Sequence, residues 1–154
     1  MRKMIYLIFI VGIVLDRITK CLALEHLTKV DTYPLWEGVL HLSYHENTGA
    51  AFSIFTGKTT MLSIFTSIVI IAGIWFMFNV KKKSPNAKAF IASIAMILSG
   101  AIGNLWDRVA YNYVVDFIDF RLINFAIFNV ADSFITVGTI ILCACLIFDK
   151  KLKL

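Results

Sequence analysis

The sequence has few charged residues and only two prolines and three cysteines. Charged side chains make up 16% of the 154 residues and hydrophobic ones 59%. Soluble domains contain about 25% charged and about 45–50% apolar residues. This shortage of charge, with a mean hydropathy of +0.80, excludes an ordinary soluble domain and predicts an integral membrane protein. The length suits a single domain over residues 1–154.

The cysteines and histidines do not have the number or spacing of a disulfide framework or a metal site. The three cysteines lie in apolar segments and form no Cys-x-x-Cys pair. His41 and His45 are four residues apart, but they lie in strand-like sequence, in which such a spacing does not bring two side chains onto one ion. We therefore expect no metal and no cofactor.

Four apolar segments predict four transmembrane helices, at about residues 4–24, 59–80, 89–106 and 132–148. About 20 residues are needed to cross a hydrocarbon core of about 30 Å. The first segment is interrupted by Asp16, Arg17 and Lys20. Its basic start and its uninterrupted apolar run of 12 residues also suit a cleavable signal peptide, but the charges that follow the run directly favour a span.

The basic residues orient the predicted spans. Nine of the fifteen lie on one side of a four-span arrangement: Arg2, Lys3, Lys81, Lys82, Lys83, Lys88, Lys150, Lys151 and Lys153. The positive-inside rule makes that side cytoplasmic, so both termini are expected inside and the connections 25–58 and 107–132 outside. The net charge of +5 is concentrated in these clusters, which argues against nucleic-acid binding.

The first outer connection predicts a small β-sheet at about residues 31–56. Leu40, Leu42 and Tyr44 alternate with other residues, as in a half-buried strand, and a second strand is predicted at 50–55 after a turn. The predicted fold class is therefore mainly α: a polytopic membrane protein with four transmembrane helices and a small extracytoplasmic sheet.

Two acids in the second outer connection are candidate catalytic residues. Asp116 lies in the apolar run VVDFIDF, and Asp132 lies just before a run of 16 residues without charge. On the predicted topology both are at the outer face, where we expect them to face each other. Such carboxylates share a proton, so that one acts as a base and the other as an acid, as in an aspartic peptidase. Paired acids also bind cations, so a small ion or proton transporter is the alternative.

Other polar residues in these segments need partners. Asp16 precedes Lys20 by four residues, the favourable order for a helical ion pair. Asn104 lies in an apolar run, where an unpaired amide is costly. In an extended segment Asp119 would face away from the side that Asp116 faces, and we expect it to pair with Arg121.

Five motifs in order give the chain its resemblance to a known family. They are LDRITK at 15–20, NTGAAF at 47–52, SGAIGNLWDR at 99–108, VVDF at 114–117 and FNVADS at 128–133. With these motifs the chain resembles the lipoprotein signal peptidases, also called signal peptidase II or prolipoprotein signal peptidases, which are bacterial membrane aspartic peptidases. The family often has glycine where Ser99 stands, a departure that touches no catalytic position.

The resemblance implies a function and a set of site residues. Members have four membrane helices, cytoplasmic termini and an outer β-cradle in the bacterial cytoplasmic membrane, with the active site near the outer face. They cut prolipoproteins before a cysteine that carries diacylglycerol. The catalytic aspartates correspond to Asp116 and Asp132. The substrate-facing and supporting positions correspond to Asn47, Gly49, Asn104, Arg108, Asn129, Asp16 and Lys20.

Overall fold

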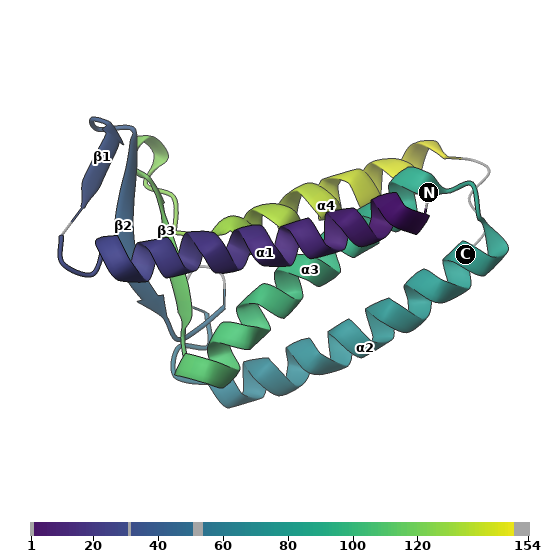
Figure 1. Cartoon of the computed structure of the whole chain (residues 1–154), viewed down its shortest axis with the longest axis horizontal. Coiled ribbons are helices and arrows are strands. Elements are labelled where there is room, and N and C mark those ends of the chain that lie inside the picture. The colour runs from purple at the N-terminus through teal and green to yellow at the C-terminus, as the bar shows by residue number, and fades with distance from the viewer. Residues whose placement is uncertain (1, 31, 51–53, 150–154) are drawn as a thin grey trace.

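The computed structural model describes residues 2–30, 32–50 and 54–149. Its elements are α1 (Arg2–His26), β1 (Tyr33–Trp36), β2 (Leu40–Asn47), α2 (Thr59–Lys83), α3 (Lys88–Tyr111), β3 (Val114–Phe120), the 3₁₀ turn η2 (Arg121–Ile123) and α4 (Val130–Phe148). The helices form an elongated bundle, and the three strands lie together at one end of it (Figure 1).

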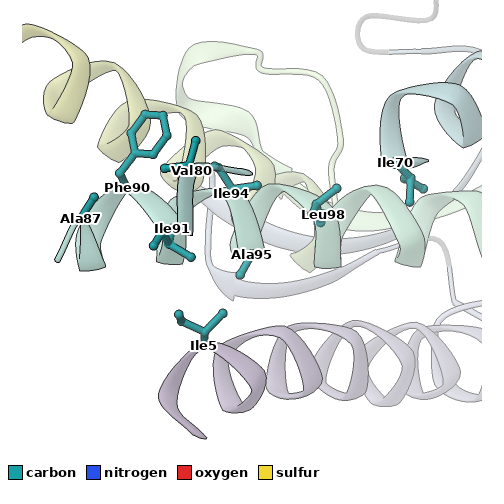
Figure 2. Packing of buried hydrophobic residues seen from close by; sticks show 9 residues of the cluster. All are labelled: Ile5, Ile70, Val80, Ala87, Phe90, Ile91, Ile94, Ala95 and Leu98. Carbon is teal, nitrogen blue, oxygen red and sulfur yellow. The ribbon is translucent and has the colours of Figure 1, made fainter. Parts of the chain in front are cut away.

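Helix α3 is the centre of the bundle and contacts α1, α2 and α4. In its most apolar 18-residue window 61% of the residues are buried, against 11% for the windows of α2 and α4. Its buried face includes Ile91, Ala95 and Leu98, and Ile5 of α1 points toward this face (Figure 2). The outer helices therefore present most of their apolar residues away from the protein, as helices in lipid do.

The structure confirms four long helices and refines which of them have the composition of a membrane span. Within the described residues α2, α3 and α4 are long and apolar enough to cross a membrane. Helix α1 does not reach that composition in the same search, and it carries Asp16, Arg17 and Lys20. The N-terminal end of α1, the α2–α3 connection and the C-terminal end of α4 lie at the end of the bundle away from the sheet (Figure 1).

The three strands form one antiparallel sheet in the order β1-β2-β3. The prediction of a strand at 50–55 is wrong for its described residues, because Ala50 N donates to Ile54 O (2.7 Å) and the chain turns there. Residues 51–53 lie outside the described part. Strand β2 instead pairs with β3, which comes 67 residues later in the chain and which brings Asp116 opposite His45.

The alternation predicted for β2 is present, but its more buried face is the polar one. His41 and Ser43 are buried, whereas Leu42 and Tyr44 are half-buried. Both polar side chains have a hydrogen-bond partner, since Thr32 Oγ1 lies at hydrogen-bond distance from His41 Nδ1 (3.1 Å) and from Ser43 Oγ (3.0 Å). Buried polar groups are tolerated when they are paired in this way.

Candidate active site

Asp116 of β3 and Asp132 of α4 line one cavity of about 1020 Å³ at the sheet end of the bundle. Polar residues from β2 and α3, the segment 124–128 and the first turns of α4 also contribute to the wall. The lining includes His45, Asn47, Asn104, Arg108, Ser133, Ile135, Thr136 and Val137. The structure thus brings together the two acids that the sequence analysis paired.

Asp132 is held by the start of helix α4. Asn129 is the N-cap: its side-chain Oδ1 accepts from Asp132 N (2.9 Å), and its backbone N donates to Asp132 Oδ2 (3.2 Å). This reciprocal arrangement is a capping box with Asp in the position usually taken by Glu or Gln. The other oxygen, Asp132 Oδ1, accepts from Asn104 Nδ2 (2.8 Å). Both oxygens therefore face donors, and the carboxylate is fixed in orientation.

Asp116 is 1% exposed and receives two side-chain amides. Asn47 Nδ2 donates to Asp116 Oδ2 (2.9 Å) and Asn129 Nδ2 donates to Asp116 Oδ1 (2.6 Å). Asn129 therefore contacts Asp116 with its amide nitrogen and the Asp132 backbone with its amide oxygen. This single side chain, which is fully buried, sets the relative position of the two carboxylates.

Burial and the neighbouring Asp132 carboxylate together raise the pKa of Asp116 to about 7, although the hydrogen bonds from Asn47 and Asn129 act to lower it. A carboxyl with a pKa near neutrality holds a proton for much of the physiological pH range. Beside a second carboxylate this makes a pair that shares one proton, as general acid–base catalysis requires.

Arg108 lies on the α3 side of the cavity, and one of its guanidinium N–H groups is not used in the hydrogen bonds described below. Its Nη2 donates to Gly49 O (2.9 Å), and Gly49 N donates to Asn47 Oδ1 (2.9 Å), so the segment after β2 is tied to α3. In the part of the chain that the structure describes, the buried Arg108 Nε has no hydrogen-bond partner. An unpartnered buried donor beside a cavity suits a ligand oxygen.

Behind Asn104 lies an ion cluster that the sequence analysis found only in part. The predicted pair is confirmed, with Lys20 Nζ 2.9 Å from Asp16 Oδ2. Asp107, which the sequence analysis did not single out, is fully buried and also binds Lys20 (3.0 Å) and Arg17. The signal for Asp107 was its position three residues after Asn104, on the same helix face.

Asp119 has different partners from Asp116, although both line the cavity. The expected ion pair is confirmed: Arg121 Nε lies 2.8 Å from Asp119 Oδ2, which also accepts from Ser43 Oγ (2.9 Å). Burial alone would raise the pKa of Asp119, but the hydrogen bonds from Arg121 and Ser43 outweigh it and lower the pKa. Asp119 therefore contributes to the cavity wall, but its ionised carboxylate is engaged by Arg121 and Ser43, which distinguishes it from Asp116.

Comparisons with known proteins give the chain its relatives. The family described as "Signal peptidase (SPase) II" matches residues 8–148. A protein named lipoprotein signal peptidase from Caldanaerobacter subterraneus subsp. tengcongensis is 46% identical, with 90% of this chain and 92% of that protein covered. One of the same name from Clostridium acetobutylicum is 42% identical over 94% of this chain and 96% of its own length.

Solved structures agree with the sequence relatives. A bacterial membrane enzyme determined by the in meso method at 2.3 Å resolution has a TM-score of 0.85 and 33% identity, covering 99% of this chain and 94% of that one. A second structure of such an enzyme, at 1.9 Å resolution, has a TM-score of 0.83, also at 33% identity, over 96% of this chain and 95% of its own. The helices and the small sheet described above are therefore those of a known membrane enzyme fold.

Proposed function

This chain belongs to the signal peptidase II family and is an aspartic peptidase of that type, and we propose that Asp116 and Asp132 are the carboxylates with which it cuts prolipoproteins. One observation carries this proposal: Asn129 holds both carboxylates at the wall of a single cavity. Family membership also decides between the two functions that paired acids left open, in favour of the peptidase over the transporter.

The geometry suits hydrolysis by a dyad that shares a proton. A water molecule between the acids gives a proton to the ionised carboxylate while its oxygen attacks the peptide carbonyl carbon. The protonated carboxyl gives its proton to the carbonyl oxygen, and the leaving amine takes a proton as the C–N bond breaks. We propose that Arg108 Nε, which lacks a partner among the described residues, donates to a backbone carbonyl of the substrate.

The shape of the cavity supports a substrate with both a peptide and acyl chains. Its polar part contains the dyad, and its wall continues along the first turns of α4 past Ile135 and Val137. The family resemblance places the cleaved bond before a cysteine that carries diacylglycerol. We propose that the acyl chains lie along this α4 side, where apolar side chains remove hydrocarbon from water.

Purified protein in detergent tests this substrate class. We expect cleavage of a diacylglyceryl-modified prolipoprotein, with mass spectrometry placing the new N-terminus at the modified cysteine. The same prolipoprotein without acyl chains should be cut at least about tenfold more slowly, because it lacks the apolar contact area. Equal rates for the two substrates would contradict recognition of the lipid.

The orientation in the membrane follows from the ends of the bundle. The basic residues Lys82 and Lys83 lie at the α2–α3 end, opposite the sheet, so we propose that this end is cytoplasmic and that the dyad opens to the outer face. In a variant without native cysteines, Glu37→Cys should react with an impermeant thiol reagent in intact cells and Lys82→Cys only after lysis. The reverse pattern would overturn the proposed orientation.

A further inference from the structure

Three buried charges and the half-buried Arg17 lie behind the dyad rather than in the cavity. Asp16 and Lys20 are fully buried, and so is Asp107, which binds Lys20 and Arg17. Within the described residues, the cavity lining includes none of the four. Buried charges in a membrane protein are expensive and usually serve its function. Since these four do not line the cavity, any part they have in catalysis passes through another residue.

Lys20 reaches the dyad through Asn104. Its Nζ donates to Asn104 Oδ1 (2.8 Å), and Asn104 Nδ2 donates to Asp132 Oδ1 (2.8 Å). An ammonium group has donors only, so Asn104 must turn its carbonyl oxygen toward Lys20 and its NH₂ toward Asp132. The ammonium charge also polarises the amide, which strengthens the hydrogen bond on its far side.

The two carboxylates differ in what surrounds them. Asp132 lies in the first turn of α4, where the helix dipole favours negative charge, and it accepts a backbone N–H and the amide that Lys20 orients. Asp116 lies in a strand between the buried Val115 and Phe117, and the side chains that donate to it in the described part of the chain are two neutral amides. Its pKa, raised to about 7 by burial and by the Asp132 charge, agrees with this difference.

We propose that Lys20 is a positioning residue for the dyad: it locks the Asn104 amide, which keeps Asp132 ionised as the base and leaves the shared proton on Asp116. This inference rests on the function proposed above. Asp132 then takes a proton from water, and the Asp116 proton goes to the carbonyl oxygen. When the C–N bond breaks, Asp132 gives its proton to the amine, and Asp116 regains one from the hydroxyl that becomes the new carbonyl.

The groups that influence the charge of Asp132 come from every neighbouring element. Asp16 Oδ1 accepts from Ala131 N (3.0 Å), directly before Asp132. Within the described residues, the charged and titratable groups of the ion cluster and of the cavity lining around Asp132 are Asp16, Arg17 and Lys20 from α1, His45 from β2, Asp107 and Arg108 from α3, Asp116 and Asp119 from β3, and Arg121 from η2. Of these, Lys20 is the cation joined to Asp132 through a single hydrogen-bonded amide.

The pH dependence of cleavage tests the proposal, with Lys20→Met and Arg17→Met as a matched pair. Each variant removes one cation from the same cluster, but in the described part of the chain Arg17 pairs with Asp107 and makes no hydrogen bond to Asn104. For Lys20→Met we expect the acidic limb of the kcat–pH profile to move to higher pH by about one unit. On that limb kcat should fall about tenfold, with KM within about twofold of the original. Arg17→Met should leave the limb in place.

The outcomes separate this role from a structural one. If the acidic limb of the kcat–pH profile is unchanged in Lys20→Met, or if Arg17→Met moves this limb by the same amount, Lys20 does not act through Asn104. If Lys20→Met does not fold, the charge-balanced variant Asp16→Asn/Lys20→Met decides, and it should show the same shift because the bond to Asn104 is lost again. Suppose that Asp116→Asn and Asp132→Asn are inactive while Lys20→Met keeps the original kcat–pH profile. That result would refute the role of Lys20 but would not affect the assignment of the two catalytic acids.

Discussion

Cleavage of a prolipoprotein should fall by at least about a thousandfold when either Asp116 or Asp132 is replaced by asparagine. In the proposed mechanism each acid has a separate task, one taking a proton from water and the other protonating the carbonyl oxygen, and a neutral amide does neither. Because the two act as one unit, the double variant should be no slower than either single one. The measurement is kcat for a purified, diacylated substrate at matched protein concentration.

Asp119→Asn is the control for these variants, since it makes the same chemical change three residues from Asp116 in the same strand. Its carboxylate is engaged by Ser43 and Arg121, and the Arg121 side chain is 43% exposed. We expect most of the activity to remain, with a loss of stability of about 1 kcal/mol. An inactive Asp119→Asn together with an active Asp116→Asn would mean that the wrong acid has been assigned.

Stability distinguishes a catalytic defect from misfolding in Asp116→Asn. In the folded protein the pKa of Asp116 is about 7, against an ordinary value of 3.8. Between these two pKa values the folded state binds a proton that the unfolded state lacks. The stability that this protonation gives the folded protein therefore decreases as pH rises and is lost above about 7. Asparagine does not titrate, so the Tm of the variant should equal or exceed the original at pH 8, with a smaller difference near pH 5. A lower Tm at pH 8 would point to misfolding.

Local patterns in the sequence were enough for much of the site. The Asp16–Lys20 pair follows from helical spacing, and the extended run around Asp116 follows from its β-branched and aromatic residues. These features depend on neighbours within four residues. The pairing of Asp116 with Asp132 came from topology and from family resemblance, and the structure adds the Asn129 amide that joins them.

Long-range contacts were the part that the sequence did not reveal. Asp107 binds Lys20 across 87 residues, and β2 pairs with β3 across a stretch that contains two helices. Neither contact leaves a periodic signal, because each depends on how helices and strands pack. For the described residues of the strand predicted at 50–55, the prediction failed for the same reason: apolar composition favours a strand, but β2 already has β1 and β3 as neighbours.

We expect catalysis to depend also on the close packing of α3 on α4. A Cβ at Gly100 would lie 2.3 Å from Ala131 O and 2.8 Å from Ile135 Cγ1. The first contact is with backbone, so it can be relieved only by moving one helix from the other. Such a movement also affects the site, since Ala131 precedes Asp132 and Asn104, one turn after Gly100, donates to Asp132.

Gly100→Ala should therefore lower both stability and kcat, whereas Gly73→Ala should not. Overpacking of this kind costs about 1–3 kcal/mol, and a displacement of about 1 Å at a catalytic group costs about a hundredfold in rate. At Gly73 the nearest atom to an added Cβ is Leu98 Cδ2 (2.8 Å), the end of a flexible side chain that can rotate, and alanine favours the helix by about 1 kcal/mol. Thermal unfolding in detergent and kcat for both variants give the comparison. If Gly100→Ala keeps the Tm and the kcat of the unmodified protein, then α3 and α4 can separate without loss of stability, and the position of Asp132 does not depend on their close contact.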